Sequence, residues 1–188
     1  MPAPITEERN LADRETLLDA AEALFYERGI RSVGMDEVRA ASGLPLKRIY
    51  RFFATKEDLV VAVLRRRDQR WRASLSAHVE QVAEPRERVL TMFDWLAEWF
   101  AEPGFRGCAW INAHGELGSQ SPAVLAEVRA HKQAFHDQVA EWVGATGEPV
   151  TEPVLLLAEG AIVTAGISGD PAPAAQARAA AARLLGAT

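Results

Sequence analysis

The sequence predicts an all-α protein of about nine helices. Apolar residues recur at helical spacing in stretch after stretch, and no stretch alternates between apolar and polar residues as a strand would. Glycine and proline lie mainly between the periodic stretches, where they favour turns and helix ends. With 188 residues, 48% hydrophobic and 25% charged, the composition is that of a globular chain and excludes a disordered or collagen-like protein.

The first quarter of the chain predicts three helices. They are expected over residues 13–28, 35–42 and 46–53. The first has a continuous apolar stripe and is followed by Gly29, which favours a helix C-terminus. Gly34 takes the capping position of the second, and residues 43–45 (Gly-Leu-Pro) form a tight turn before the third. The third is barely two turns long, so it is stable only when docked.

Six further helices follow. Thr55 is expected to cap the fourth, with Asp58 three residues on as its partner in a capping box. The fourth is expected to end near residue 82, and the others cover residues 85–101, 106–116, 122–143, 152–168 and 172–185.

Two short helices joined by a glycine-containing turn and packed on a longer first helix are typical of a helix-turn-helix. Three runs also fit a known family. They are LDAA, LF and RG within residues 18–29, MDEV and ASGLP within 35–45, and IYRFF and KEDL within 49–59. Together they resemble the DNA-binding domain of TetR-type (TetR/AcrR) transcriptional regulators. The resemblance implies a DNA-binding domain over residues 1–56 and a helical ligand-binding and dimerisation domain over residues 57–188.

Six residues are expected to contact DNA. Lys47 and Arg48 lie in the first turn of the third helix, which enters the major groove in a helix-turn-helix, and could reach base edges. By resemblance, Tyr50 and Arg51 meet the DNA backbone and Lys56 contacts a phosphate. Where the family often has Ser or Thr, this chain has a glycine that offers only a backbone N–H to phosphate. The set is Gly34, Lys47, Arg48, Tyr50, Arg51 and Lys56.

The charge distribution supports this interpretation independently of the family. The whole chain has a formal net charge of -5. Residues 27–56, however, hold seven basic and three acidic side chains, whereas residues 73–188 hold seven basic and fourteen acidic. A basic end on an acidic body is typical of a protein that docks on DNA by one end. The arginines of residues 65–72 are expected to form a solvated helix face that pairs with Asp68 and Glu80.

The C-terminal half is rich in aromatic residues, which suggests a ligand pocket with a few polar groups. The alternative is that these aromatic residues only fill the core. The candidate ligand residues are Trp95, Trp99, Trp110, Asn112, His114 and Glu116.

A catalytic or metal site finds little support. Cys108 and His114 are six residues apart on one expected helix and face different directions, so the cysteine is expected to be buried and structural. His131 and His136, five residues apart, do not share a face either. We therefore expect no enzymatic activity, no metal and no cofactor.

The last two helices, over about residues 152–185, are apolar on nearly every face and contain many small residues. A helix of this kind must be covered all round, so a second copy of the chain is the expected cover. By resemblance, this pair forms a four-helix bundle in a homodimer. No apolar stretch approaches the length of a membrane span, and the first ten residues are too acidic for a secretory signal, so we expect a cytoplasmic protein.

The sequence thus predicts a homodimeric regulator, most simply a repressor, that a small molecule releases from a palindromic DNA operator. The alternative is a helical small-molecule binding protein without a DNA role. A hydrolase that uses Cys108 is a third and much weaker hypothesis.

Overall fold

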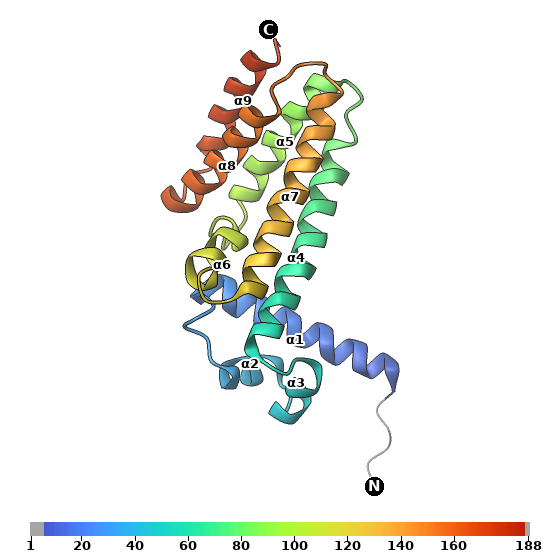
Figure 1. The fold of residues 1–188 in the computed structure, drawn as a ribbon, viewed down its shortest axis with the longest axis vertical. Coiled ribbons are helices and arrows are strands. Elements are labelled where there is room, and N and C mark those ends of the chain that lie inside the picture. The colour runs from blue at the N-terminus through green and yellow to red at the C-terminus, as the bar shows by residue number, and fades with distance from the viewer. Residues whose placement is uncertain (1–5, 187–188) are drawn as a thin grey trace. The chain divides into compact units, whose positions relative to one another are not determined.

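The computed structural model describes residues 6–186, so the first half of the acidic N-terminal segment lies outside the described residues. The described chain holds nine α-helices and no strand, which confirms the predicted fold class (Figure 1). The helices are α1 (Glu7–Arg28), α2 (Met35–Ser42), α3 (Leu46–Phe52), α4 (Lys56–Val79), α5 (Pro85–Phe100), α6 (Ala109–Leu117), α7 (Pro122–Gly144), α8 (Thr151–Ser168) and α9 (Ala172–Leu184).

The largest difference from the expected helix bounds lies at the start of the chain. Helix α1 begins at Glu7, two turns before the expected start, and the Thr6 hydroxyl caps it by accepting the backbone N–H of Arg9 at 3.3 Å. These two turns are mostly polar, and their one large apolar side chain, Leu11, is exposed, so hydrophobic periodicity does not report them. The capping box of α4 is present as predicted: the Asp58 carboxylate accepts the Thr55 N–H, and the Thr55 hydroxyl accepts the Asp58 N–H.

The chain divides into two compact units. The first holds the residues up to Arg67 together with residues 112–127, and the second holds residues 68–111 together with those from Val128 onward. The division therefore passes through α4, α6 and α7, and the second half of α6 belongs to the unit that contains the helix-turn-helix.

The first unit has a small core beneath its short helices. Helix α1 packs on α2, and α2 packs on α3. Leu17, Leu18 and Ala21 of α1 are buried, as are Val38 of α2 and Ile49 of α3. The two short helices therefore depend on this core for their stability.

In the second unit, α9 packs against both α5 and α8. Helix α8 buries only one stripe, made of Val154, Ala158, Ala161, Ile162 and Ala165. Within the described residues α8 alone is long and apolar enough to cross a membrane, with a mean hydropathy of 1.3 and only 28% of it buried. The sequence analysis had predicted that no apolar stretch approaches the length of a membrane span. It did not detect α8, because the acidic residues of this helix interrupt the apolar runs without making the helix polar. Since its buried stripe packs on α5 and α9, we interpret α8 as a core helix with one uncovered face.

Candidate nucleic-acid interface and ligand groove

The turn between α2 and α3 is built by one glycine and one proline. Gly43 has φ +68°, in the left-handed region that favours glycine, and its N–H closes α2 on the Arg39 carbonyl at 3.0 Å. Pro45, with φ -62°, then starts α3. Ile49 is fully buried and fixes the inner face of α3 on the unit.

Three of the predicted DNA-binding residues share the exposed side of α3. Lys47, Tyr50 and Arg51 are all exposed, and 47% of the Tyr50 surface is open to solvent. They occupy positions i, i+3 and i+4, which lie on one helical face. The structure therefore brings together two cations and a phenol on the outward face of the recognition helix.

Arg48 differs from the expectation. Its side chain is 9% exposed, and its Nε donates a hydrogen bond to the Asp13 carboxylate of α1 at 3.0 Å. The guanidinium carbon also lies 4.6 Å from the centre of the Phe52 ring. Arg48 thus fastens α3 to α1 instead of reaching outward to a base edge. The sequence carried no signal for this pair, because Asp13 lies 35 positions away.

Lys56 and Glu116 hold the segment between α1 and α2. The Glu116 carboxylate accepts the backbone N–H groups of Ile30 and Arg31, at 3.0 and 2.8 Å. On the same segment, Lys56 Nζ donates to the Ile30 carbonyl at 2.5 Å. Burial lowers the pKa of Lys56, although the nearby carboxylates oppose this shift.

This segment also requires its glycine. Gly29 has φ +87°, and a Cβ there would lie 3.3 Å from a Glu116 carboxylate oxygen. Glu116 therefore belongs to a clamp on the helix-turn-helix, where the sequence had suggested a ligand-binding role.

Gly34 is engaged within the chain. Its N–H donates to the Glu37 carboxylate at 2.8 Å, and Glu37 also pairs with Arg28. The Gly34 N–H and the Arg28 guanidinium lower the pKa of Glu37. A phosphate at this helix N-terminus would have to share the Gly34 N–H with that carboxylate.

The arginines that follow on α4 pair within the chain. In the first unit, Arg66 and Arg67 both contact the Glu22 carboxylate of α1. In the second, Arg72 pairs with Asp68, which confirms one of the expected pairings. These partners account for the charge of the segment without DNA.

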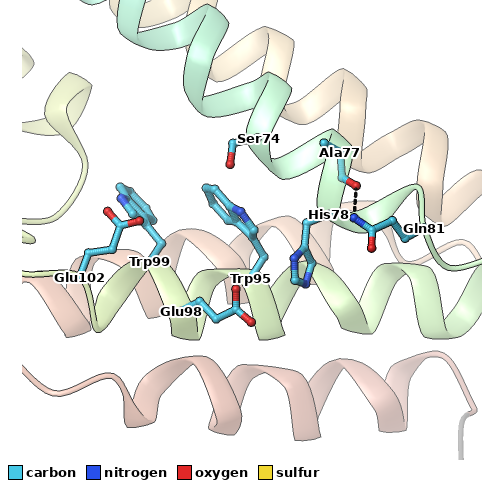
Figure 2. A pocket seen from close by; sticks show the side chains of 8 residues that line it. All are labelled: Ser74, Ala77, His78, Gln81, Trp95, Glu98, Trp99 and Glu102. Carbon is cyan, nitrogen blue, oxygen red and sulfur yellow. Dashed lines mark hydrogen bonds between the residues drawn. The ribbon is translucent and has the colours of Figure 1, made fainter.

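Two of the predicted ligand residues line a groove in the second unit. Trp95 and Trp99 of α5 have ring centres 5.8 Å apart and planes inclined by 26°. Figure 2 shows them side by side, facing α4. The groove has a volume of about 360 Å³ and is lined by Ser74, Ala77, His78, Gln81, Trp95, Glu98, Trp99 and Glu102.

The other predicted ligand residues lie elsewhere. Trp110 is buried and stacks on the His131 ring, with centres 3.4 Å apart. Asn112 and His114 are exposed residues of the first unit. The structure therefore divides the expected pocket into a groove beside α5, a buried stack and the Glu116 clamp.

His131, which the sequence analysis considered only as a metal ligand, is a buried polar residue. Its Nδ1 lies 2.7 Å from the Asp68 carboxylate. Burial lowers the pKa of His131, against the influence of Asp68. Burial alone would raise the pKa of Asp68, but hydrogen bonds from His131 and Arg72 outweigh it and lower that pKa to about 2.

Cys108 is buried, as expected for a structural cysteine. Lys132 Nζ lies 3.6 Å from its sulfur and pairs with Glu159 at 2.7 Å. Across residues 6–186, no three His, Cys, Asp or Glu side chains form a group that could hold a metal ion.

Known proteins resemble this chain in both sequence and fold. Residues 17–63 match the family described as bacterial regulatory proteins, tetR family. An uncharacterised HTH-type transcriptional regulator of Mycobacterium tuberculosis is 39% identical over 79 residues, which are 42% of this chain and 38% of that protein. The HTH-type transcriptional activator FasR of Mycolicibacterium smegmatis is 26% identical over 130 residues, 69% of this chain and 58% of FasR.

The fold likeness extends over nearly the whole chain. The crystal structure of SCO4454, a TetR-family transcriptional regulator from Streptomyces coelicolor, has a TM-score of 0.84 and 29% identity, over 92% of this chain and 94% of that one. The curated sequence relatives are matched over a shorter part, less than two thirds of their length. The family match covers the helix-turn-helix whose exposed cations are described above, and the fold match covers the remaining helices. Residues 17–63 are therefore similar to the DNA-binding domain of the tetR family, and the chain shares its fold with a TetR-family transcriptional regulator.

Proposed function

We propose that this protein is a cytoplasmic, DNA-binding transcriptional regulator that acts as a homodimer on a palindromic operator. The observation that carries the proposal is the outward face of α3, where Lys47, Tyr50 and Arg51 are exposed on a helix whose inner face is fixed by buried Ile49. A recognition helix must be held rigidly on the rest of its domain, and its polar side chains must be exposed so that they can contact DNA.

The residues of the helix-turn-helix then have different roles. Lys47, in the first turn of α3, reaches base edges, and Tyr50 and Arg51 contact the DNA backbone. Arg48 orients α3 through Asp13 and is a positioning residue. Lys56 contributes positive potential near the DNA while its hydrogen bond to the Ile30 carbonyl shapes the segment before α2.

Glu116 offers a route for regulation. It lies on α6, yet its carboxylate holds two backbone N–H groups of the segment between α1 and α2. A displacement of α6 would therefore release or drag the start of α2. We propose that a small molecule bound in the second unit prefers a conformation of α6 in which this clamp no longer fits the DNA-bound arrangement, so DNA is released. Coupling of this kind is typically worth about 1–3 kcal/mol.

The uncovered face of α8 supports dimerisation through α8 and α9. Leu156, Gly160, Val163 and Ile167 are exposed and spaced as a single helical stripe, and Ile167 is 83% exposed. Leu184 of α9 is exposed as well. An apolar stripe of this length is a cost in water that a second copy of the chain removes.

Selection of duplexes from a random pool, followed by fluorescence polarisation, tests the DNA-binding role. We expect a palindromic operator, and an affinity that falls with salt at a log–log slope of roughly 0.9 per phosphate contacted. Arg51→Ala should lower this slope by about 1, and Lys47→Ala should cost about 1–3 kcal/mol of sequence discrimination. Arg129→Ala, which removes an exposed arginine of α7, is the matched control.

If no duplex is enriched and the variants bind as the wild type does, the protein is a helical small-molecule binding protein without a DNA role.

A reporter gene placed behind the selected operator measures whether the protein represses or activates transcription. We expect the reporter to rise when the regulator gene is deleted, as for a repressor. A fall would instead indicate an activator, which is how FasR is described.

A further inference from the structure

The groove beside Trp95 and Trp99 is formed by matching stripes of two helices. On α5 and the turn that follows it, the lining residues have the spacing i, i+3, i+4 and i+7, from Trp95 to Glu102. On α4 and its following turn, they have the same spacing, from Ser74 to Gln81. On the α4 side, Ser74 and Ala77 are small and leave room. Gln81 is folded back, with its Nε2 on the Ala77 carbonyl at 2.8 Å, so it does not fill the space (Figure 2).

The chemistry of the walls selects one kind of occupant. The apolar part of the wall is the exposed edge of two largely buried tryptophans, Trp95 (8% exposed) and Trp99 (7% exposed). They are backed by Trp71, whose ring centre lies 5.3 Å from that of Trp95 and 5.5 Å from that of Trp99. The acidic residues of the lining are Glu98 and Glu102, its one basic side chain is His78, and no lysine or arginine is among the lining residues. These carboxylates lie at the C-terminal end of α5, where the helix dipole also favours positive charge.

An anion would face two carboxylates, and a neutral apolar molecule would leave them without a partner. An organic cation satisfies both parts of the lining: its apolar body contacts the exposed edges of the indole rings, and its charge lies near the carboxylates. A volume of about 360 Å³ is suited to a ligand with one aromatic ring or a short alkyl group.

We propose that this groove binds a small organic cation, such as a substituted amine or a quaternary ammonium compound. The further step, that this cation is the effector, rests on the function proposed above. Ligand binding itself does not depend on it, because the groove lies wholly within the second unit.

Benzyltrimethylammonium is a suitable probe, with benzyl alcohol as a neutral compound that has the same ring. In calorimetric titrations of the full chain without DNA, we expect the cation to bind at least about tenfold more tightly than the alcohol. The double variant Glu98→Gln/Glu102→Gln keeps the shape of the groove and should lower the affinity for the cation about tenfold. Affinity for benzyl alcohol should not change.

Glu80→Gln/Glu141→Gln removes the same charge from exposed positions outside the groove and should bind the cation as the wild type does. Equal affinity for the cation and the alcohol, or wild-type cation affinity in Glu98→Gln/Glu102→Gln, overturns the groove proposal. Failure of the chain to bind any duplex in the absence of the cation overturns the regulator proposal and leaves the groove intact. If the cation binds through the two carboxylates but does not lower operator affinity, the groove is a cation site and the effector role is wrong.

Discussion

The outer face of α3 and the outer face of α8 are both exposed, but they differ in chemistry. The face of α3 presents Lys47, Tyr50 and Arg51, whereas that of α8 presents an apolar stripe that ends at Ile167. Water solvates the first well and the second poorly. The comparison teaches that exposure alone does not identify a partner: the charged face fits a polyanion, and the apolar face fits a second apolar helix.

The largest expected effect comes from putting charge on the apolar face. Val163→Glu/Ile167→Glu would bury two carboxylates in the dimer interface, which should weaken dimerisation by about 3 kcal/mol or more. Sedimentation velocity should then find monomers, and operator affinity should fall because the two half-sites are no longer read together. Ala126→Glu/Ala130→Glu has the same spacing on exposed positions of α7 and should stay dimeric. A dimeric Val163→Glu/Ile167→Glu protein would exclude this face as the interface.

Two arginines of α3 test which charged residues of this helix stabilise the fold and which bind DNA. Arg48→Ala leaves Asp13 without its partner in a largely buried setting, so the free energy of unfolding should drop by about 2 kcal/mol in urea titrations. Arg51→Ala removes an exposed side chain and should change it by less than about 0.5 kcal/mol. DNA binding by the folded protein should depend more on Arg51. Equal stabilities for the two variants would mean that Arg48 is not a structural residue.

The clamp on the helix-turn-helix should show a smaller effect. Glu116→Gln keeps one acceptor but places an amide NH2 against a backbone N–H, which should cost about 1 kcal/mol of stability and reduce operator affinity. Glu127→Gln, in the same unit, removes only the partner of the solvent-exposed Arg65 and should cost about 0–0.5 kcal/mol. If both variants bind the operator as tightly as the wild type, the clamp does not contribute to DNA binding.

The smallest effect is a dependence of stability on pH in the second unit. Burial lowers the pKa of His131 in the folded protein below 6.5, so on acidification the unfolded chain takes up this proton first. Stability should therefore fall as the pH drops below about 6.5, and His131→Gln should flatten this dependence on the acidic side of that pH.

His136 serves as the opposite control. Glu152 and Asp137 raise its pKa, so its contribution is present below pH 6.5 and is lost as the pH rises through the higher folded value. His136→Gln should therefore remove a dependence of opposite sign. Urea midpoints at several pH values measure both variants, and an unchanged profile in His131→Gln would show that another group titrates in this range.

Much of the fold was predictable, because it rests on local signals. Periodicity located every helix, and Gly29, Gly43 and the Thr55 capping box marked the helix ends that the structure has. The exposed face of α3 also followed from spacing, since Lys47, Tyr50 and Arg51 lie on one side of a helix whose other side is apolar. Only the polar first turns of α1 had no periodicity to report them.

The roles of individual charged residues were not predictable, because they depend on partners far away in the chain. Arg48 and Arg51 are chemically the same, yet one meets Asp13 of α1 and the other meets solvent. Glu116 was expected to bind a ligand, but it meets backbone N–H groups that lie 86 and 85 positions earlier.

The sequence by itself determined the helices, the likeness of residues 17–63 to the tetR family and the basic character of residues 27–56, because each of these depends on residues that are close together in the chain. Tertiary structure alone decided which charges remain available and where a groove opens. The groove exists because a stripe of small and polar residues on α4 lies opposite the Trp and Glu stripe of α5. Neither stripe forms a groove alone, so only the packing of one helix on the other creates the site.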